Sequence, residues 1–433
     1  MKKVLFFAVV ILLFLACKEE GKTILTTGSQ VPVDSLFVDF YSFKKSINPI
    51  ESTKAGYRAY NDTIANYISD DYQLHLKERY AYFLDALSQY DSISVGADNW
   101  MSLKVMEWDC SIKLEGLMNP LTTMASPIYD LPSFELMPLF QIQSLHLYVA
   151  QLGGGSSVQP FITEEDYRNW LERLADYLVF IDTCIVKMEE GIQQGIVLPK
   201  TLTLKMLSQI QSFINVPLEK NLFYKPILNF SETVPQEKQE KLKKAYTAFI
   251  SDKLVPKYEL LNNFLVEIYL PACRTTDGIG DLPNGVATYN YLIRLHTTTN
   301  LSADEIHNLG LSEVARIRGE MEKVKSEIGF KGDLKSFFEF IRTNNDLKPF
   351  TEPQEVIAHF NKVKERISIR LDSVFTSRPK AGFEVKRTEA FREASASAEY
   401  VPGSKDGKRS GTFYVPISNV KEFNTLQNEA LFL

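Results

Sequence analysis

Cysteine and histidine are scarce in this chain of 433 residues, which has four cysteines and five histidines. No two cysteines are spaced as CxxC, and no histidine is followed by glutamate or by a second histidine four positions on. These absences exclude a CxxC pair and an HExxH zinc helix within this sequence. Cys110, Cys184 and Cys273 are predicted to be small buried apolar side chains, with at most one disulfide among them.

Other signatures of function are also missing. The sequence has no Walker A phosphate loop and no GxSxG nucleophile elbow. Its net charge is −6 and no basic stripe is present, so nucleic acid is not expected as a partner. Beyond the first residues no apolar run reaches membrane-spanning length. The chain is 45% apolar and 24% charged, which is the composition of a protein with a large core.

The N-terminus has the pattern of a bacterial export signal. Lys2-Lys3 precedes an apolar run from Val4 to Leu15, which is too short to cross a bilayer core as a helix. The residues that follow resemble a lipobox, in which the signal peptide is cut after Ala16 and Cys17 is lipidated. We therefore expect residues 1–16 to be a lipoprotein signal peptide and Cys17 to anchor the chain to a lipid bilayer. The alternative is a plain secretory signal with a chance cysteine.

The residues after Cys17 predict where the anchored protein resides. Lys18, Glu19 and Glu20 resemble the surface-export signal of Bacteroidota lipoproteins, and the alternative for them is a solvated charged linker. Residues 17–36 are polar on the whole and have no apolar period, so they are predicted to form a lipidated tether. The expected location is the cell envelope, with the protein held by lipid, including palmitate, in the outer membrane and exposed at the surface.

Most of the remaining chain has the periodicity of long amphipathic helices. The clearest predicted helix opens at Thr163, where Asp166 is placed to complete a capping box. Gly195 and Pro199 are predicted to end it. Its apolar residues recur at gaps of three and four and form one stripe: Tyr167, Trp170, Leu171, Leu174, Leu178, Ile181, Ile185, Met188 and Ile192.

Three further helices are predicted downstream. One covers residues 235–269, and Pro256 is expected to kink or split it. The pairs Ser302/Glu305 and Thr351/Gln354 have the capping-box spacing and predict two more helix starts. The inward residues of these two helices are predicted to be Ile306, Leu309, Ile317, Met321 and Val324 in the first, and Val356, Phe360, Val363, Ile367 and Leu371 in the second.

The pattern changes after about residue 377. Phe383 to Arg387 alternates apolar and polar residues, as a strand does. Ala398 to Val401 and Thr412 to Ile417 are also β-prone, and Gly403, Asp406 and Gly407 between them are turn residues. The predicted fold class is therefore mainly α, a large helical domain with a small β-sheet near the C-terminus.

The last residues look like the beginning of another helix. Thr425 is a candidate N-cap, and the apolar residues Leu426, Ala430, Leu431 and Leu433 follow it. The sequence stops about two turns later with no capping residue, and helices this short are marginal alone. We interpret the chain as truncated, and the alternative is a natural end.

Several long segments resemble one protein family. The longest are Met188–Pro199 (MEEGIQQGIVLP), Gly278–Gly285 (GIGDLPNG) and Asp406–Tyr414 (DGKRSGTFY). Further matches in the same order are Tyr289, Tyr291, Leu292, residues 296–299, 305–310 and 313–317, Glu320 and Met321. The family is domain of unknown function 885, whose members are often bacterial lipoproteins and are similar to zincin-type metallopeptidases. The resemblance covers roughly residues 37–433 and implies one zincin-like domain that is incomplete here.

The same resemblance implies a zinc site that this sequence does not contain. In the family, a segment like 428–433 continues into an HExxxGHH-like motif, whose two imidazoles one helical turn apart bind zinc. The intervening glutamate can then accept a proton from the metal-bound water. Because the motif is absent, no catalytic residue and no metal ligand can be assigned in this chain. Zinc is implied only for a full-length relative.

A peptide-binding strand is implied as well. In zincin-like folds a strand beside the zinc helix often pairs with the substrate backbone, and Thr412 to Ile417 is the candidate for β-augmentation. Arg409 or Tyr414 could meet a substrate carboxylate or oxyanion, so the substrate-binding set is Arg409, Thr412, Phe413 and Tyr414. The alternative is that Arg409 belongs to a turn and the aromatic residues belong to an ordinary strand.

Three functions remain open on the sequence. The first is an exported lipoprotein that resembles a zinc-dependent peptidase, a hydrolase, but is inactive as given because the HExxH motif is absent. The second is a non-catalytic surface lipoprotein that binds peptides or other nutrients. The third is an inert fragment. The expected partners are the lipid bilayer, through Cys17, and a peptide substrate.

Overall fold

The computed structural model describes residues 31–119, 134–141, 144–154, 158–388, 393, 397–401, 403 and 410–432. Cys17, the residues of the export signal and Arg409 lie outside these ranges. The chain divides into two compact units, unit 1 up to Ala303 and unit 2 from Asp304 onward. The sequence had predicted one helical domain. The boundary falls at the start of a helix, α14, which begins at Ala303 after the short polar segment 298–302.

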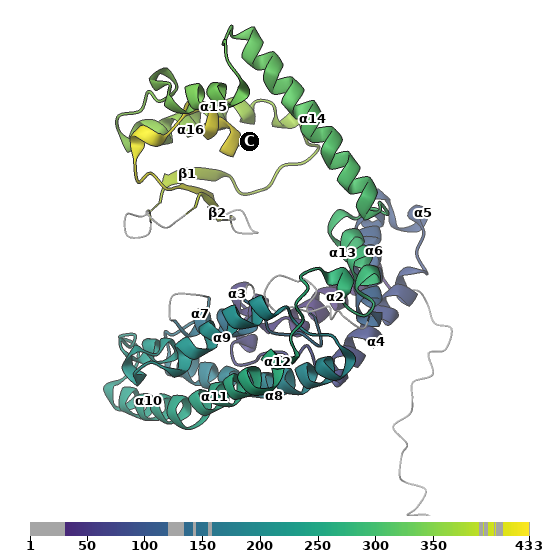
Figure 1. The fold of residues 1–433 in the computed structure, drawn as a ribbon, viewed down its shortest axis with the longest axis vertical. Helices are drawn as coiled ribbons and strands as arrows, with labels where there is room; N and C mark the ends of the chain where they lie inside the picture. The colour runs from purple at the N-terminus through teal and green to yellow at the C-terminus, as the bar shows by residue number, and fades with distance from the viewer. Residues whose placement is uncertain are drawn as a thin grey trace, which may run out of the picture. The chain divides into compact units, whose positions relative to one another are not determined.

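Unit 1 is built from helices alone in its described part (Figure 1). They are α2 (Val33–Ile47), α3 (Pro49–Lys54), η1 (Arg58–Tyr60), α4 (Asp70–Leu87), α5 (Ser92–Val95), α6 (Ala97–Met118), α7 (Leu145–Gly153), α8 (Glu164–Gln194), α9 (Lys200–Ile214), η2 (Leu218–Lys220), η3 (Leu222–Ile227), α10 (Gln236–Phe249), η4 (Ile250–Leu254), α11 (Val255–Phe264), η5 (Leu265–Tyr269), α12 (Leu270–Ala272), η6 (Ile279–Asp281) and α13 (Gly285–Thr297).

The predicted tether is shorter than the sequence indicated. Helix α2 begins at Val33 instead of after residue 36, with Pro32 at its N-cap and Asp34 in its first turn. Leu36, which had been placed in the tether, is fully buried in the core of unit 1. The polar composition of residues 21–35 hid this start, because all the apolar residues of α2 except Val33 follow residue 35.

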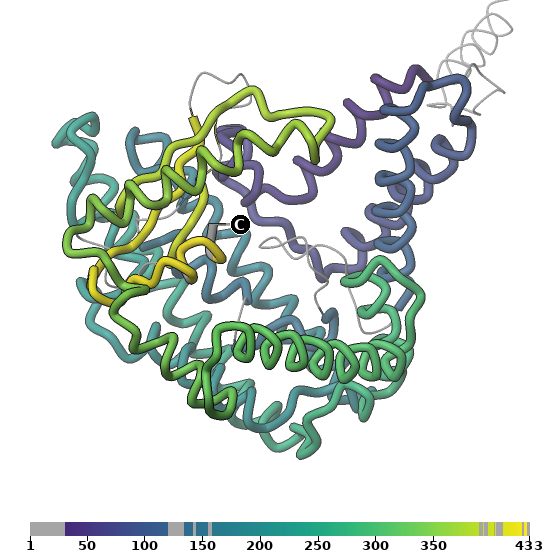
Figure 2. Tube along the Cα trace, turned by 90° about the horizontal axis from the view of Figure 1, so that it is seen from above, coloured from purple at the N-terminus to yellow at the C-terminus, as the bar shows by residue number. Residues whose placement is uncertain are grey.

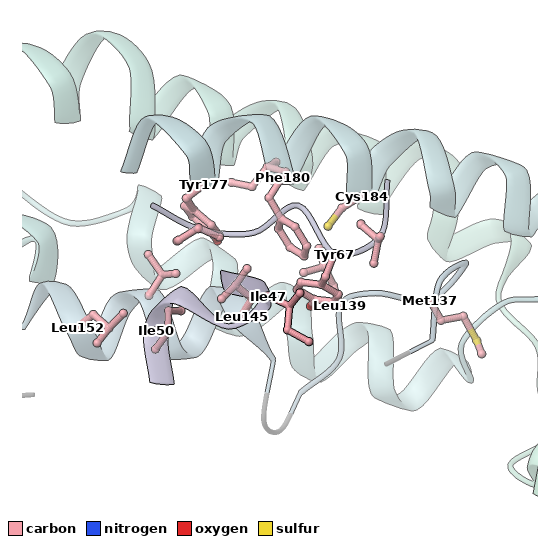
Figure 3. Close-up of a cluster of buried hydrophobic side chains, with 14 of the residues drawn as sticks. Ile47, Ile50, Tyr67, Met137, Leu139, Leu145, Leu152, Tyr177, Phe180 and Cys184 are labelled. Carbon is pink, nitrogen blue, oxygen red and sulfur yellow. The ribbon is translucent and has the colours of Figure 1, made fainter. Parts of the chain in front are cut away.

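Helix α8 runs through the core of unit 1 and confirms its prediction. Thr163 and Asp166 form the capping box, and Gly195 ends the helix in the left-handed conformation. Trp170, Leu174 and Ile181 are fully buried, while the outer residues of the predicted stripe are half-buried. Figure 3 shows Tyr177, Phe180 and Cys184 of this helix directed toward Ile47 and Ile50 of α2 and α3 and toward Tyr67.

The helix predicted over residues 235–269 continues through Pro256 instead of breaking there. A π-helical turn, Ile250–Leu254, ends two residues before Pro256, and a second one, Leu265–Tyr269, ends two residues before Pro271. Proline has no N–H and its ring crowds the preceding turn. A π-turn widens the helix at that point, so the chain from α10 to α12 accommodates both prolines without a break.

Unit 2 contains helices and one small sheet. Its elements are α14 (Ala303–Glu327), α15 (Leu334–Thr343), η7 (Asn345–Leu347), α16 (Pro353–Ser368), α17 (Leu371–Val374), β1 (Phe383–Arg387), β2 (Glu399–Val401), β3 (Gly411–Val415), η8 (Val420–Glu422) and α18 (Thr425–Phe432). The small sheet near the C-terminus is therefore confirmed. The core of unit 2 is a cluster of buried side chains from α16, the sheet and neighbouring loops: Phe350, Val356, Phe360, Val385, Val415 and Ile417.

Of the two helices predicted in unit 2, one buries its apolar face as predicted and the other does not. Helix α16 buries Val356, Phe360 and Val363 as predicted. Its cap lies one residue later than predicted, because Glu355, not Gln354, accepts hydrogen bonds from the backbone N–H groups of Thr351 and Glu352. Helix α14, the long green helix of Figures 1 and 2, has no buried residue. The prediction that its apolar stripe points into a core is wrong, because periodicity shows which side chains share a face but not whether another segment covers that face.

The cysteines behave as predicted. Cys110 and Cys184 are buried and Cys273 is partly buried, and all three are free thiols in the described chain. Burial raises the pKa of the Cys184 thiol well above its usual value, so this side chain is not a nucleophile near neutral pH. Among the described residues, no helix combines the length and apolar character needed to cross a membrane.

Candidate functional site

The sheet of unit 2 holds most of the residues predicted to bind a substrate. Its strand order is β1-β3-β2, so β3 is the central strand. Residues 412–414 of β3 pair with β1 in parallel on one side and with β2 in antiparallel on the other. The prediction that this segment offers its edge to a peptide is therefore wrong, because both edges are already occupied by neighbouring strands.

The edge of the described sheet is β2 instead. Its residues Glu399, Tyr400 and Val401 are all exposed, and within the described part of the chain β3 is the only strand that pairs with it. A strand at the edge of a sheet has one side of its backbone available for a further extended chain. The other outer strand, β1, is less open, since Lys364 donates a hydrogen bond to the carbonyl of Phe383.

The two faces of the sheet differ in what covers them. On one face Phe413 of β3 contacts Phe360 of α16, with ring centroids 5.9 Å apart, and Val385 and Val415 are buried beside them. Thr412 and Tyr414 alternate with these residues and therefore lie on the opposite face. Of the predicted substrate-binding set, Phe413 is partly buried and packs against the core of unit 2, and Thr412 is buried and paired on both sides. The roles predicted for Tyr414 and Arg409 stay predictions.

Tyr400 ties the edge strand to the rest of the sheet. Its ring lies edge-on to Phe383 of β1, with centroids 6.2 Å apart, and it reaches there across Gly411 of the central strand. A Cβ atom on Gly411 would lie 2.2 Å from the Tyr400 hydroxyl, so a larger residue there would displace the exposed Tyr400 ring from its present position. Gly411, the glycine of the GTFY segment, therefore leaves room for the Tyr400 ring to lie against the central strand. The sequence motif alone did not reveal this role of the glycine.

The beginning of the last helix lies next to α16. Glu429 of α18 forms an ion pair with Arg366 of α16, with an Oε2–Nη2 distance of 2.7 Å, and Asn428 is buried between the helices. The hydrogen bond from Arg366 and its positive charge hold the pKa of the Glu429 carboxyl below its usual value. No group of three or more His, Cys, Asp or Glu side chains in the described part of the chain could hold a metal ion. These residues do not fit a zinc site, and no step of chemistry through zinc follows from them.

A second candidate site lies in unit 1, where two of the family-like segments meet. Pro199 and Arg274 form a parallel β-bridge, and the guanidinium of Arg274 donates hydrogen bonds to the carbonyls of Val197, Thr276 and Gly278. Next to this bridge is a pocket of about 280 Å³. Its lining is mainly apolar: Phe134, Met137, Phe140, Gln141, Leu198, Pro199, Leu202, Arg274, Asp277, Ile279 and Leu282.

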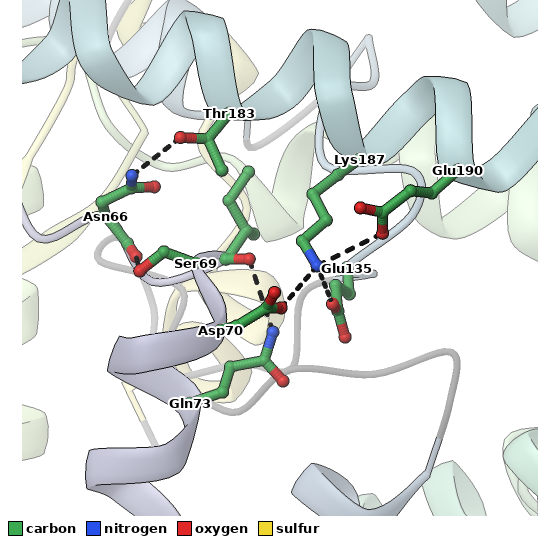
Figure 4. A network of polar contacts seen from close by, with 9 residues as sticks. Asn66, Ser69, Asp70, Gln73, Glu135, Thr183, Lys187 and Glu190 are labelled. Atoms are coloured by element: carbon green, nitrogen blue, oxygen red, sulfur yellow. Dashed lines mark hydrogen bonds and ion pairs between the residues drawn. The ribbon is translucent and has the colours of Figure 1, made fainter.

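A charged network holds one wall of this pocket in place (Figure 4). The ammonium of Lys187 lies 2.6 Å from Asp70 of α4, 2.7 Å from Glu135 and 3.3 Å from Glu190. Burial alone would lower the pKa of Lys187, but its hydrogen bonds to Asp70 and Glu135 raise that pKa above its usual value. Lys187 therefore stays charged and fixes the segment that carries Phe134, Met137 and Phe140.

The lining of this pocket is suited to binding an apolar ligand. Its ionisable side chains are those of Asp277 and Arg274, and the guanidinium of Arg274 already bonds to backbone carbonyls. Gly191 lets the wall approach closely, since a Cβ there would meet the carbonyl oxygens of Ile196 and Leu136 at 2.6 and 2.8 Å. Both segments are recognisable in the sequence, but their contact is not, because they lie about 80 residues apart and no local pattern encodes such a contact.

The family of the chain follows from comparison with known proteins. The family model described as a bacterial protein of unknown function (DUF885) matches residues 49–433, so the chain belongs to this family. The resemblance stated from the sequence is thereby confirmed at the level of the family. None of the curated proteins compared with the chain matches it.

Two solved structures share the fold at low sequence identity. A "putative lipoprotein" from Colwellia psychrerythraea is similar with a TM-score of 0.71 and 18% identity, covering 92% of this chain and 69% of that one. A "putative lipoprotein of unknown function" from Shewanella oneidensis is similar with a TM-score of 0.51 and 13% identity, covering 93% of this chain and 67% of that one. At these identities the likeness concerns the fold alone.

Proposed function

We propose that this chain is a lipid-anchored envelope protein that binds extended peptides along strand β2, on the scaffold of a zinc-peptidase-like family. The observation that carries peptide binding is the position of β2, an exposed edge strand with one side paired to β3. A peptide added there would gain main-chain hydrogen bonds for affinity, and its alternate side chains would meet the two faces of the sheet.

The anchor is supported by residues 15–17, which resemble a lipobox, and by the names of the two similar structures. We expect Cys17→Ala to release the protein from the outer membrane and to abolish incorporation of a fatty-acid label. If the variant still carries label and still sediments with membranes, Cys17 is not the anchor. Surface exposure through Lys18, Glu19 and Glu20 is tested by protease treatment of intact cells.

Peptide binding at β2 is tested by photo-crosslinking on the full chain. A benzoylphenylalanine at Val401 of β2 should crosslink to extended peptides of a random library. The same group at Val324 of α14, also an exposed valine of unit 2, should not. Equal crosslinking at both positions, or none at Val401, would overturn the assignment of β2 as the binding edge.

Hydrolysis rests on the family resemblance alone. It is measured on the same peptides, with and without a zinc chelator and with zinc added back. Cleavage that stops with the chelator and returns with zinc supports a peptidase. Crosslinking at Val401 without any cleavage supports a peptide-binding lipoprotein that is not an enzyme, which is the alternative left open by the sequence.

A further inference from the structure

An apolar groove lies between α2 and α6 in unit 1, far along the chain from the sheet of unit 2. The groove measures about 450 Å³, and Phe37 and Phe40 of α2 face Val105, Met106 and Trp108 of α6 across it. None of these residues is part of the proposed peptide site. An apolar occupant would be favoured there, because it would cover the aromatic and aliphatic side chains of this lining and remove them from water.

Exposed apolar side chains are also present elsewhere on the two helices. Val38 of α2 is 66% exposed, and Val105 and Met101 of α6 are 62% and 67% exposed. Trp108 is 38% exposed, so its indole is partly in the groove and partly in solvent. A tryptophan in this position has the amphipathic character of side chains that lie at the boundary between lipid and water.

The only carboxylate that lines the groove is neutralised by lysines. Asp109 of α6 lies 3.7 Å from the ammonium of Lys44 and 2.8 Å from that of Lys113. The ammonium of the next residue, Lys45, lies over the rings of Tyr41 and Tyr57. The carboxylate in the groove is therefore paired, and the two aspartates and two lysines of α2 cancel. Attraction to a lipid surface must then come from apolar contact and not from net charge.

The position of α2 close to Cys17 in the chain favours a lipid bilayer as the occupant of the groove. Val33, the first residue of α2, follows Cys17 by 16 residues. A segment of 16 residues reaches at most about 55 Å even when it is fully extended. A bilayer that holds the lipid of Cys17 is therefore always close to the first wall of the groove, at a high effective concentration.

We infer that the α2–α6 groove, with Val38, Val105 and Trp108, docks against the lipid surface that holds the anchor, so that unit 1 lies on the membrane instead of moving freely at the end of its tether. This inference rests on the anchor in the proposed function and adds a second contact to it. One lipid anchor and one apolar surface together give firmer attachment than either gives alone.

Vesicles that carry bromine on their acyl chains test the contact directly. The full lipidated protein is reconstituted in vesicles of phosphatidylethanolamine and phosphatidylglycerol, and quenching of tryptophan emission is measured. The comparison is made in a Trp100→Phe background, because Trp100 of α6 is also partly exposed. There most of the quenching should disappear when Trp108→Phe is added, because Trp170 is fully buried. Equal quenching in the variant and in the wild type would overturn the inference.

A second measurement uses unlipidated protein, the Cys17→Ala chain, and its partition onto the same vesicles. Adding Val38→Asp and Val105→Asp should lower that partition about tenfold or more, since apolar contact is replaced by two charges at the lipid boundary. The matched control is Val179→Asp with Val186→Asp, two exposed valines of α8, which should not change it. Circular dichroism confirms that each variant is folded.

The outcomes separate this inference from the anchor itself. If wild-type protein incorporates no lipid label but still partitions through Val38 and Val105, the anchor is wrong and the groove contact stands. If the label is incorporated but neither quenching nor partition depends on the groove residues, the anchor stands and the contact is wrong. Self-association without vesicles that is lost in the Val38→Asp, Val105→Asp variant would show that a second copy of the chain is the occupant, which also overturns the inference.

Discussion

The two units hold a buried charge in different ways. In unit 1, Arg173 is fully buried, and its guanidinium donates to four neutral acceptors, on Thr63, Gln159, Thr53 and Tyr60. In unit 2, the carboxylate of the buried Glu393 accepts two hydrogen bonds of 2.7 Å from the oppositely charged Arg387. A large helical core can surround a charge with backbone and side-chain acceptors, whereas the small core of unit 2 holds its charge through an ion pair at the sheet.

The first prediction tests how much unit 1 depends on its buried guanidinium. Burial lowers the pKa of Arg173 to about 10, although the carboxylates of Asp62 and Asp176 act against that shift. The arginine is still charged at neutral pH, and Arg173→Met would leave its acceptors unpaired inside the core. We expect a loss of about 3–5 kcal/mol in the free energy of unfolding, measured by urea titration.

The control lies on the same helix. Arg168 of α8 is exposed and pairs only with Glu164, so Arg168→Met should leave the unfolding midpoint unchanged. If Arg173→Met and Arg168→Met lose similar stability, loss of any arginine from α8 is enough to explain the effect. The burial of Arg173 would then not be its cause.

The second prediction tests whether unit 2 is a separate cooperative unit. Phe360→Ala removes the largest side chain shared by α16 and the sheet. We expect a loss of about 3 kcal/mol or slightly more. Hydrogen exchange should accelerate for β1, β3 and α16 and stay unchanged for α8. Faster exchange in α8 as well would show that the two units unfold together.

The third prediction concerns the pH dependence of unit 1. The buried His146 lies 3.0 Å from the Ser144 hydroxyl through Nδ1 and 3.3 Å from Oε1 of Gln209 through Nε2. The amide nitrogen of Gln209 donates to the carbonyl of Gln141, so its oxygen faces His146 and the ring is assigned as neutral with the proton on Nε2. Burial lowers the pKa of His146 from 6.5 to about 4.

The sign of the effect follows from that pKa. Between pH 6.5 and 4 the unfolded chain binds a proton at this histidine that the folded chain does not, so stability falls as the pH falls. The contribution of His146 is about 3 kcal/mol across this window. Urea titrations at pH 7 and pH 4 should show that the free energy of unfolding falls less between the two pH values for His146→Gln than for the wild type. His307→Gln on the exposed α14 serves as the control, and the same change in both variants would contradict the assignment.

The sequence predicted the local features best. The capping box at Thr163, the end of α8 at Gly195 and the bounds of β1 depend on neighbouring residues, and all three are confirmed. The strand at 412–417 was found, but its place in the sheet was not. An unbroken apolar run such as TFYV is typical of a strand buried in the middle of a sheet, and this property could have identified it as central instead of as the edge.

Other errors arose where the outcome depends on distant parts of the chain. Helices α14 and α16 have equally clear apolar stripes, yet only α16 is covered, because β1 and β3 pack on it. The pocket in unit 1 also requires residues near 137, 198 and 279 to meet, which no local pattern encodes. Of the predicted site, Thr412, Phe413 and Tyr414 are found together on β3, while the exposed Tyr400 and Val401 of β2 were not singled out because a strand of three residues gives little signal.

The smallest expected effect concerns how α18 is held to α16. The ion pair between Arg366 and Glu429 is exposed to solvent, so it is screened and should add little to stability. Asn428 is buried beside it and should matter more. We expect Arg366→Gln to leave the thermal midpoint unchanged within error and Asn428→Asp to lower it, because the second substitution places a charge in a buried position. Hydrogen exchange of residues 425–432 should follow the same order. A clear loss for Arg366→Gln that disappears at high salt would show that unit 2, unlike unit 1, relies on a surface charge to hold one of its helices.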